Sequence, residues 1–249
     1  MSHDLTFVVI ARDETAVAGP TMSSADRAVA AARDAGLGVE CVLALVAPTP
    51  GTRSYFGQSR FDHWDRRELA ETDLGGARHA LLPDTQGRYV GLLEVGDLVS
   101  CNWLVAGARA LDDAAGRQER AIAHPELGVV FDGRREVVLT VDHRSVLFSP
   151  HYLYFRDYYD APCLAPRQAL LELPHDVPRG PSAPDRELTV ESMAAGWRHL
   201  VVADTIHFAR CRDLSSDGPD VGPATVGRSL PALAIDRIRD LGPERVSRG

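Results

Sequence analysis

Two carboxylates, Glu94 and Asp97, stand three positions apart directly after a short apolar run, residues 89–93. That run is long enough for a buried strand and too short for a globular helix, and a helical pattern follows with Asn102 in the N-cap position. In open α/β sheets, ligands bind at the edge where the strands end. Carboxylates there can hold a hard divalent cation or a ribose hydroxyl, although they can also form a solvated acidic turn.

The elements that must position these carboxylates alternate along the first half of the chain. Apolar runs at residues 5–11 and 39–47 predict two buried strands, and a helix is expected between them, from Ser23 or Ser24 to about residue 35. A strand, a helix and a second strand indicate a right-handed parallel unit. Residues 52–72 are expected to form a helix with loops, and residues 74–80 a short helix.

The second half predicts a hairpin, an aromatic cluster and a late helix and strand. Its expected elements are strands at 121–131 and 136–141 around an Asp132-Gly133 turn, a helix at 185–195, a strand at 199–203 and a short helix at 232–240 in a loose tail. The aromatic residues of segment 152–160 either line a pocket or pack in the core. The whole pattern predicts an α/β fold with a mainly parallel sheet.

Composition excludes several classes of function. The chain has 249 residues, 45% of them hydrophobic, with a net charge of −8 and a pI near 5.6, which argues against nucleic-acid binding. Its apolar runs are too short for a transmembrane segment, and we expect a soluble, cytoplasmic protein without a signal peptide. Four widely spaced cysteines contain no Cys-x-x-Cys pair, so reduced thiols are expected and a structural zinc site is not.

Six segments of the chain, taken in order, form a recognisable series of motifs. They are Ala11-Arg12-Asp13-Glu14-Thr15, Gly76-Ala77-Arg78-His79, Gly87 to Leu104, His124-Pro125-Glu126, Asp185 to Gly196, and Thr205 to Arg210. In this order they resemble the family 2 glycosyltransferases of GT-A fold. The likeness covers roughly residues 4–215, which it implies to be one Rossmann-like GT-A domain with helices on both faces of the sheet. Residues 216–249 would then be a loose C-terminal tail.

The sequence departs from the family pattern at four positions. Val46 stands where many relatives carry an Asp that binds the nucleotide base, and His79 replaces an Asn. Gly96 replaces the metal-binding Asp of the metal motif, while Glu94 and Asp97 keep the carboxylates on either side. Pro184 replaces the Glu that precedes the expected base.

The resemblance implies roles for particular residues. Asp185, at the start of an acceptor-side helix, would be the catalytic base, although Asp is also a common helix N-cap; Glu187 and Glu191 are the fallbacks. Ala11, Arg12, Asp13, Glu14, Arg78 and Glu94 would bind the donor. Glu94, Asp97 and His207 would hold a weakly bound divalent metal, Mn²⁺ or Mg²⁺, although a lone His among apolar residues is more often a core group. His124 is interpreted as structural.

The implied activity is inverting transfer of a hexose-type unit from a nucleotide-sugar donor, most simply a UDP-sugar, to a small-molecule or carrier-bound acceptor. The short chain leaves little room for a separate acceptor domain, which leaves open a homodimer or a partner protein. One alternative is a non-catalytic relative that binds a partner or a nucleotide, as Gly96, Val46 and Pro184 would allow. Another is a nucleotidyltransferase, against which the lack of a Gly-rich, Lys-containing loop counts.

Overall fold

The computed structural model describes residues 3–70, 74–133, 135–154, 158–159, 163–173, 184–211 and 237–242. Its strands are β1 (His3–Ala11), β2 (Val39–Val46), β3 (Asp65–Leu69), β4 (Gly87–Glu94), β5 (Leu98–Val99), β6 (Ala121–Phe131), β7 (Glu136–Leu139), β8 (Leu164–Pro166) and β9 (Arg198–Arg210). Its α-helices are α1 (Ala18–Asp34), α2 (Pro50–Phe56), α3 (Leu74–Leu81), α4 (Trp103–Gly116), α5 (Arg167–Glu172) and α6 (Pro184–Ala194). Short 3₁₀ helices are η1 (Ser59–Phe61), η2 (Leu82–Asp84), η3 (Pro150–Tyr154) and η5 (Ile238–Leu241).

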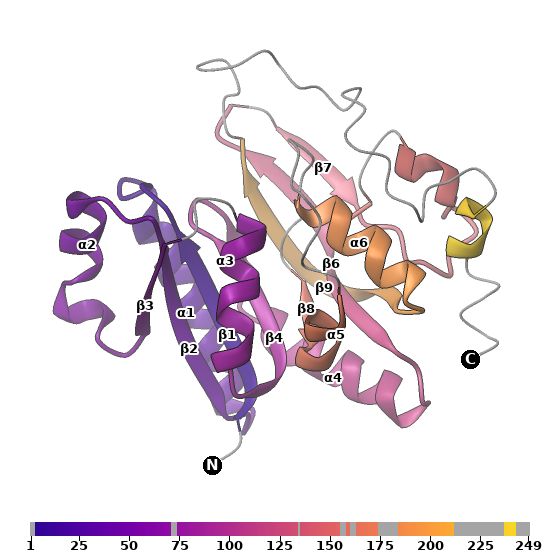
Figure 1. The fold of residues 1–249 in the computed structure, drawn as a ribbon, viewed down its shortest axis with the longest axis horizontal. Coiled ribbons are helices and arrows are strands. Elements are labelled where there is room, and N and C mark those ends of the chain that lie inside the picture. The colour runs from indigo at the N-terminus through magenta and orange to yellow at the C-terminus, as the bar shows by residue number, and fades with distance from the viewer. Residues whose placement is uncertain are drawn as a thin grey trace.

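One sheet runs through the described chain in the order β3-β2-β1-β4-β8-β6-β9-β5, with β7 paired to β6 alone (Figure 1). Strands β1 to β4 pair in parallel, and so do β6 and β9. Because β8 lies antiparallel between β4 and β6, the strands on its two sides point the same way. The carboxyl ends of β1, β2, β4, β6 and β9 therefore meet along one edge, and the predicted mainly parallel α/β fold is confirmed.

Helices cover both faces of the sheet. In β1, alternate residues such as Phe7 and Val9 face one core with the apolar sides of α1 and α4, while Val8 and Ile10 face a second core with α3 and α5. This division follows from the period of two in strand side chains. Figure 1 places α3, α5 and α6 in front of the sheet and α1 behind it.

In the first half, the expected strands at 5–11, 39–47 and 89–93 correspond to β1, β2 and β4. Helix α1 begins at Ala18, several residues before Ser23, because Pro20 falls in its first turn, where a helix needs no backbone donor. The prediction of helix and loops at 52–72 is wrong in part, since this stretch also contains the edge strand β3.

In the second half, the hairpin of β6 and β7 is confirmed, and its turn has the left-handed φ values of 63° at Asp132 and 129° at Gly133. The expected strand at 199–203 and the late segment 205–210 form one long strand, β9. β8 and α5 were not predicted. Residues 232–236 of the expected tail helix lie outside the described residues, and η5 begins only at Ile238.

Candidate functional site

The turn after β4 carries the two predicted carboxylates to the carboxyl edge of the sheet. Glu94 is the last residue of β4, and it lies opposite Ile10 of β1. The backbone N–H of Asp97 donates to the carbonyl of Glu94 at 3.1 Å, which closes a tight turn. Gly96 takes a φ of +110° in this turn, a conformation that residues with a side chain rarely adopt. The glycine between the two carboxylates thus has a structural reason.

A buried ion pair joins Glu94 to the helix in front of it. Nη2 of Arg78, on α3, lies 3.1 Å from Oε1 of Glu94, and both residues are 8% exposed. The structure therefore brings together two of the residues predicted to bind the donor. A buried guanidinium whose planar fork can also reach oxyanions is a suitable group beside a diphosphate.

The carboxylate of Asp97 lies against the end of β9. Its Oδ2 lies 3.2 Å from Nε2 of His207, and its Oδ1 accepts the backbone N–H of Arg210 at 2.9 Å. Both Asp97 and His207 are buried. The late strand thus does bring His207 to the carboxylate edge, 110 positions along the chain from Asp97.

These residues fit two ligands of a metal ion. An oxygen and a nitrogen bound at right angles to one ion, each at about 2.1 Å, would be about 3 Å apart, close to the separation of Asp97 and His207. Glu94 instead faces Arg78. Within the described ranges, no group of three or more His, Cys, Asp or Glu side chains is arranged to hold a metal.

The loop after β1 is largely closed on itself. The carboxylate of Glu14 accepts the backbone N–H of Arg12 at 2.9 Å and lies 3.4 Å from the guanidinium of the same residue. Asp13 is exposed, and Ala11 is the buried last residue of β1. Since β1 and β4 are neighbours, this loop starts beside Glu94, as the donor-site prediction requires.

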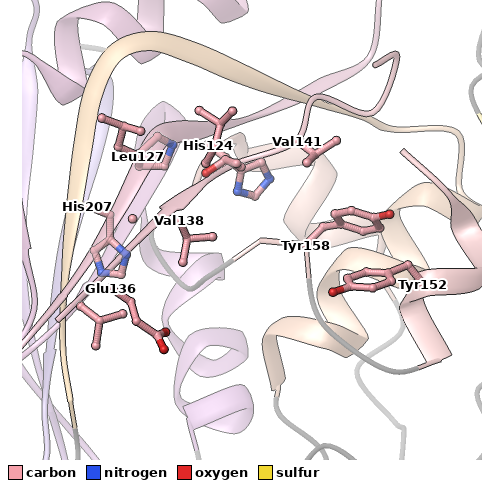
Figure 2. A pocket seen from close by; sticks show the side chains of 13 residues that line it. His124, Leu127, Glu136, Val138, Val141, Tyr152, Tyr158 and His207 are labelled. Carbon is pink, nitrogen blue, oxygen red and sulfur yellow. The ribbon is translucent and has the colours of Figure 1, made fainter. Parts of the chain in front are cut away.

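A cavity of about 320 Å³ lies beside this edge, between the β6–β7 hairpin, β9 and the aromatic segment (Figure 2). Its walls include His124, Glu136, Val138, Tyr152, Tyr158 and His207. The hydroxyl of Tyr158 contacts the backbone of Ser149, which fixes this ring as a wall. Because His207 lines the cavity and also binds Asp97, the cavity and the carboxylate turn share one side chain.

The aromatic segment divides between the two roles that the sequence left open. Tyr152 and Tyr158 line the cavity, with ring centroids 5.2 Å apart. Tyr159 is buried and stacks on His124 and His199 at centroid distances of 4.3 and 4.7 Å. Both the pocket and the core interpretations therefore hold, for different residues.

A chain of buried hydrogen bonds runs from α6 to the cavity. Oγ of Ser192 lies 2.8 Å from Nε2 of His199, and Nδ1 of His199 lies 2.8 Å from Nε2 of His124. Burial lowers the pKa of His124 to about 3, and burial together with the neighbouring histidines holds the pKa of His199 well below its usual value. Both imidazoles are therefore neutral near pH 7.

The partners of Ser192 fix where the protons in this chain lie. Its hydroxyl donates to the carbonyl of Leu188 at 2.6 Å, and the tautomer consistent with this bond has His199 donating from Nε2. Neutral His199 then accepts at Nδ1, and His124 donates from Nε2. His124 is left with a bare Nδ1, which is buried and has no hydrogen-bond partner among the described residues. An acceptor left unsatisfied in this way costs about 1–3 kcal/mol.

The sequence indicates only a structural role for His124, so this network was not predicted. His199 lies 75 positions away, and no local pattern announces that pairing. The only local signal was the placement of His124 on a strand that ends at the site edge.

Asp185 is the second residue of α6, which agrees with the predicted helix start. Its side chain lies outside the described part of the structure, so its role as base stays a prediction. The short connection from α6 to β9 makes this helix run antiparallel to the strand. Its N-terminus therefore points toward the carboxyl edge, as Figure 1 also shows.

Solved structures with a similar fold include those of Staphylococcus aureus TarS. A crystal structure of TarS 1–349 superposes with a TM-score of 0.55 at 16% identity, covering 82% of this chain and 60% of that one. The same protein in complex with UDP-GlcNAc gives 0.57 at 14% identity, over 86% of this chain and 60% of that one. The fold is GT-A-like.

This GT-A-like chain covers only part of the length of the TarS chains that it matches. A further TarS structure matches with a TM-score of 0.54 at 15% identity over 83% of this chain but only 37% of its own length. No family model matches the sequence. No curated protein sequence matches it either. In the described part of the chain, no helix is long and apolar enough to cross a membrane.

Proposed function

We propose that this protein transfers a sugar unit from a UDP-linked donor to a hydroxyl-bearing acceptor, small or carrier-bound, with inversion at the sugar carbon. The observation that carries the proposal is the turn after β4. It places the Arg78–Glu94 pair and the Asp97–His207 pair three residues apart at the carboxyl edge, next to a cavity. The likeness to TarS, which has been crystallised with UDP-GlcNAc and with UDP, supports a nucleotide-sugar donor.

The proposal assigns each step of the transfer to one group. The acceptor oxygen attacks the sugar C1 and forms the new bond, while the bond from C1 to the diphosphate oxygen breaks and its electron pair leaves with the nucleotide. Asp185, at the N-terminus of α6, takes the acceptor proton. Arg78 stabilises the negative charge that develops on the diphosphate. The loop of Arg12, Asp13 and Glu14 borders the nucleotide.

A divalent ion remains part of the proposal. Asp97 and His207 would hold it, and the diphosphate and water would complete its coordination, so binding should be weak without nucleotide. When bound, the ion would neutralise charge on the leaving diphosphate. A thermal-shift titration with UDP, with and without Mn²⁺, tests this, because a ligand of the native state raises its stability. An equal shift by UDP in EDTA and in Mn²⁺ would remove the ion from the proposal.

The donor site is tested by two arginine variants of one region. Arg78→Gln should weaken UDP binding by about tenfold or more, because hydrogen bonds to charged groups contribute about 1.5–3 kcal/mol. Arg88→Gln is the matched control, since Arg88 is exposed at the opposite end of β4 and pairs with Asp112. Calorimetric titration with UDP compares the two variants with the wild type.

The double variant Arg78→Gln/Glu94→Gln removes both charges of the buried pair. It therefore separates lost binding from the cost of leaving Glu94 buried without its arginine. If the double variant binds UDP as tightly as the wild type, Arg78 does not contact the diphosphate.

The alternative function is a non-catalytic protein that binds a nucleotide or a partner. The observation in its favour is that Arg78 and Glu94 already satisfy each other, and that Gly96 supplies no metal ligand. Mass spectrometry of reactions with a panel of nucleotide sugars distinguishes the two. Nucleotide binding without turnover of any donor would favour the alternative.

A further inference from the structure

Arg210 brings a further cation to the edge of the sheet where β4 ends. It is the last residue of β9, and its backbone N–H donates to Oδ1 of Asp97 at 2.9 Å. This bond fixes the base of the Arg210 side chain beside the turn after β4. The guanidinium at the other end of the side chain is paired with Asp132, in the turn between β6 and β7.

The stem of the Arg210 side chain lies in front of Gly96. A Cβ placed on Gly96 would be 3.8 Å from Cδ and 3.9 Å from Cβ of Arg210. It would also be 3.9 Å from Cγ2 of Val17, which ends the loop after β1. The arginine therefore lies between the carboxylate turn and the loop that is predicted to border the nucleotide.

The two ion pairs of this edge restrain their arginines to different degrees. In the Arg78–Glu94 pair the side chains are 9% and 10% exposed, and breaking it would leave a buried charge without compensation. In the Arg210–Asp132 pair the side chains are 28% and 54% exposed. An exposed ion pair gains little, because water competes for both charges. Arg210 can therefore exchange its partner more readily than Arg78 can.

The carboxylates of this edge leave little positive charge for an anionic ligand. The loop after β1 and the turn after β4 carry Asp13, Glu14, Glu94 and Asp97, with Arg12 as their own arginine. Arg12 already pairs with Glu14, and Arg78 pairs with Glu94. A diphosphate adds further negative charge, so binding it here requires a cation that these carboxylates do not already neutralise.

We propose that Arg210 binds the diphosphate of the donor, and that its guanidinium turns from Asp132 to the phosphate oxygens when the nucleotide binds. The planar fork of an arginine can donate two parallel hydrogen bonds to such oxygens. The inference rests on the proposed function, because it names a further group that holds the donor at the same site. Asp132 then holds the arginine in the free protein and competes with the nucleotide for it.

Two substitutions separate diphosphate binding from a structural role of the ion pair. Arg210→Gln removes the cation. Asp132→Asn removes only the partner of that cation, and asparagine tolerates the left-handed backbone at this position, where φ is 63°. If the ion pair merely stabilises the hairpin, both variants should change UDP binding in the same way. If Arg210 binds the diphosphate, the two variants should differ.

The probe is UDP, titrated calorimetrically into the full chain with and without Mn²⁺. Arg210→Gln should weaken UDP binding by about tenfold or more, while Asp132→Asn should bind UDP at least as tightly as the wild type. Arg210→Lys keeps the charge but not the fork, so its affinity for UDP should lie between those of Arg210→Gln and the wild type. Thermal unfolding of the free variants records the separate effect of losing the ion pair.

Uridine, which lacks the diphosphate, is the control ligand, and saturation-transfer NMR measures its weaker binding. Arg210→Gln should leave the affinity for uridine within about twofold of the wild type, because the lost hydrogen bonds are to phosphate oxygens. Equal weakening of UDP and uridine binding in this variant would overturn the inference. Unchanged UDP binding in Arg210→Gln, or equal weakening by Asp132→Asn, would also overturn it.

The remaining outcomes distinguish this inference from the proposed function. Absence of UDP binding by the wild type would overturn both. UDP binding that depends on Arg210, without transfer from any UDP-sugar, would leave the inference standing and remove the proposed function. Sugar transfer with an unchanged kcat/KM in Arg210→Gln would do the reverse.

Discussion

The two halves of the carboxyl edge of the sheet differ in the charge of their buried polar groups. At the ends of β1 and β4, the buried groups are ionic, as in the Arg78–Glu94 pair. Behind β6 and β9, the buried groups are neutral imidazoles stacked under Tyr159, and the pKa of His124 and of His199 is lowered by burial. A charged leaving group suits the first half, and an uncharged hydroxyl suits the second. Under the proposed function, this difference in charge alone divides the edge into a donor side and an acceptor side.

The largest expected effect concerns the residue that would connect the two sides. Asp185→Asn keeps the size and capping ability of the side chain but removes the base, so turnover should fall by roughly 10²–10⁴-fold with UDP binding little changed. Product formation measured by mass spectrometry tests this. Glu187→Gln and Glu191→Gln test the two fallback carboxylates of the same helix, and full activity of Asp185→Asn would give the base role to another group.

Acidification should destabilise the half of the sheet formed by β6 and β9 before the half formed by β1, β2 and β4. The pKa of His124 falls from 6.5 in the unfolded chain to about 3 in the folded one, so the unfolded state binds more protons between these values. The stability that neutral His124 contributes is fully present above about pH 6.5 and is lost progressively as the pH falls toward 3. The loss should be about 1.4 kcal/mol per pH unit for each buried histidine that stays neutral.

Urea unfolding at pH 7, 6 and 5 measures this slope. Hydrogen exchange over the same range locates it: protection of β6, β9 and α6 should fall before that of β1, β2 and β4. Carboxylates such as Asp142 titrate lower, because hydrogen bonds from Arg144 and Arg198 outweigh the effect of burial and lower the pKa of this group. Uniform loss of protection across the sheet would break the comparison between the halves.

The turn after β4 should not tolerate a side chain at Gly96. Gly96→Ala forces a residue with a Cβ into a φ of +110°, which costs about 1–3 kcal/mol, and it should also displace Asp97 from His207. Gly116→Ala, at the end of α4, is the control because nothing lies within 4 Å of the added Cβ, and it should be neutral or slightly stabilising. Denaturant midpoints of the two variants give the answer; similar values would mean that the turn relaxes.

The smallest effect compares one hydroxyl in each half. Tyr159 donates to the carbonyl of Val141 at 2.9 Å, so Tyr159→Phe should lower the free energy of unfolding by about 1 kcal/mol. Tyr55 packs against the core of the first half, and its hydroxyl makes no hydrogen bond to another described residue, so Tyr55→Phe should change stability little. Chemical denaturation of both variants tests the pair, and a larger loss for Tyr55→Phe would contradict it.

The sequence predicted those strands whose own residues determine their structure. β1, β2 and β4 are buried on both faces, so continuous apolar runs predicted them and placed Glu94 and Asp97 at a strand end. β3 escaped because four of its five residues are charged, as befits an edge strand. The hydrogen bonds that link Ser192 to His124 were not predicted, because they depend on how three distant segments pack. Periodicity carries no information about that packing.

The resemblance added what periodicity could not, namely the expectation that His207 returns to the carboxylate turn. The contact with Asp97 confirms the placement, while the metal role of both residues stays a prediction. The reverse holds for Gly96. The sequence shows that Gly96 has no side chain to bind a metal. Only the structure shows its left-handed backbone, which explains why glycine stands there.

The parallel pairing of β6 with β9 has a consequence for how the chain folds during synthesis. Strands β1, β2 and β4 can pair once about the first hundred residues have emerged, whereas β6 finds its parallel partner only when the segment ending at Arg210 is complete. Closing so long a loop slows folding, because its entropy is lost before the contacts form. The half of the sheet that carries Glu94 should therefore form on the ribosome while the half built on β6 and β9 is incomplete. A chain arrested before β9 would carry a sheet in which β6 is paired to β7 and β8 but has its other edge open.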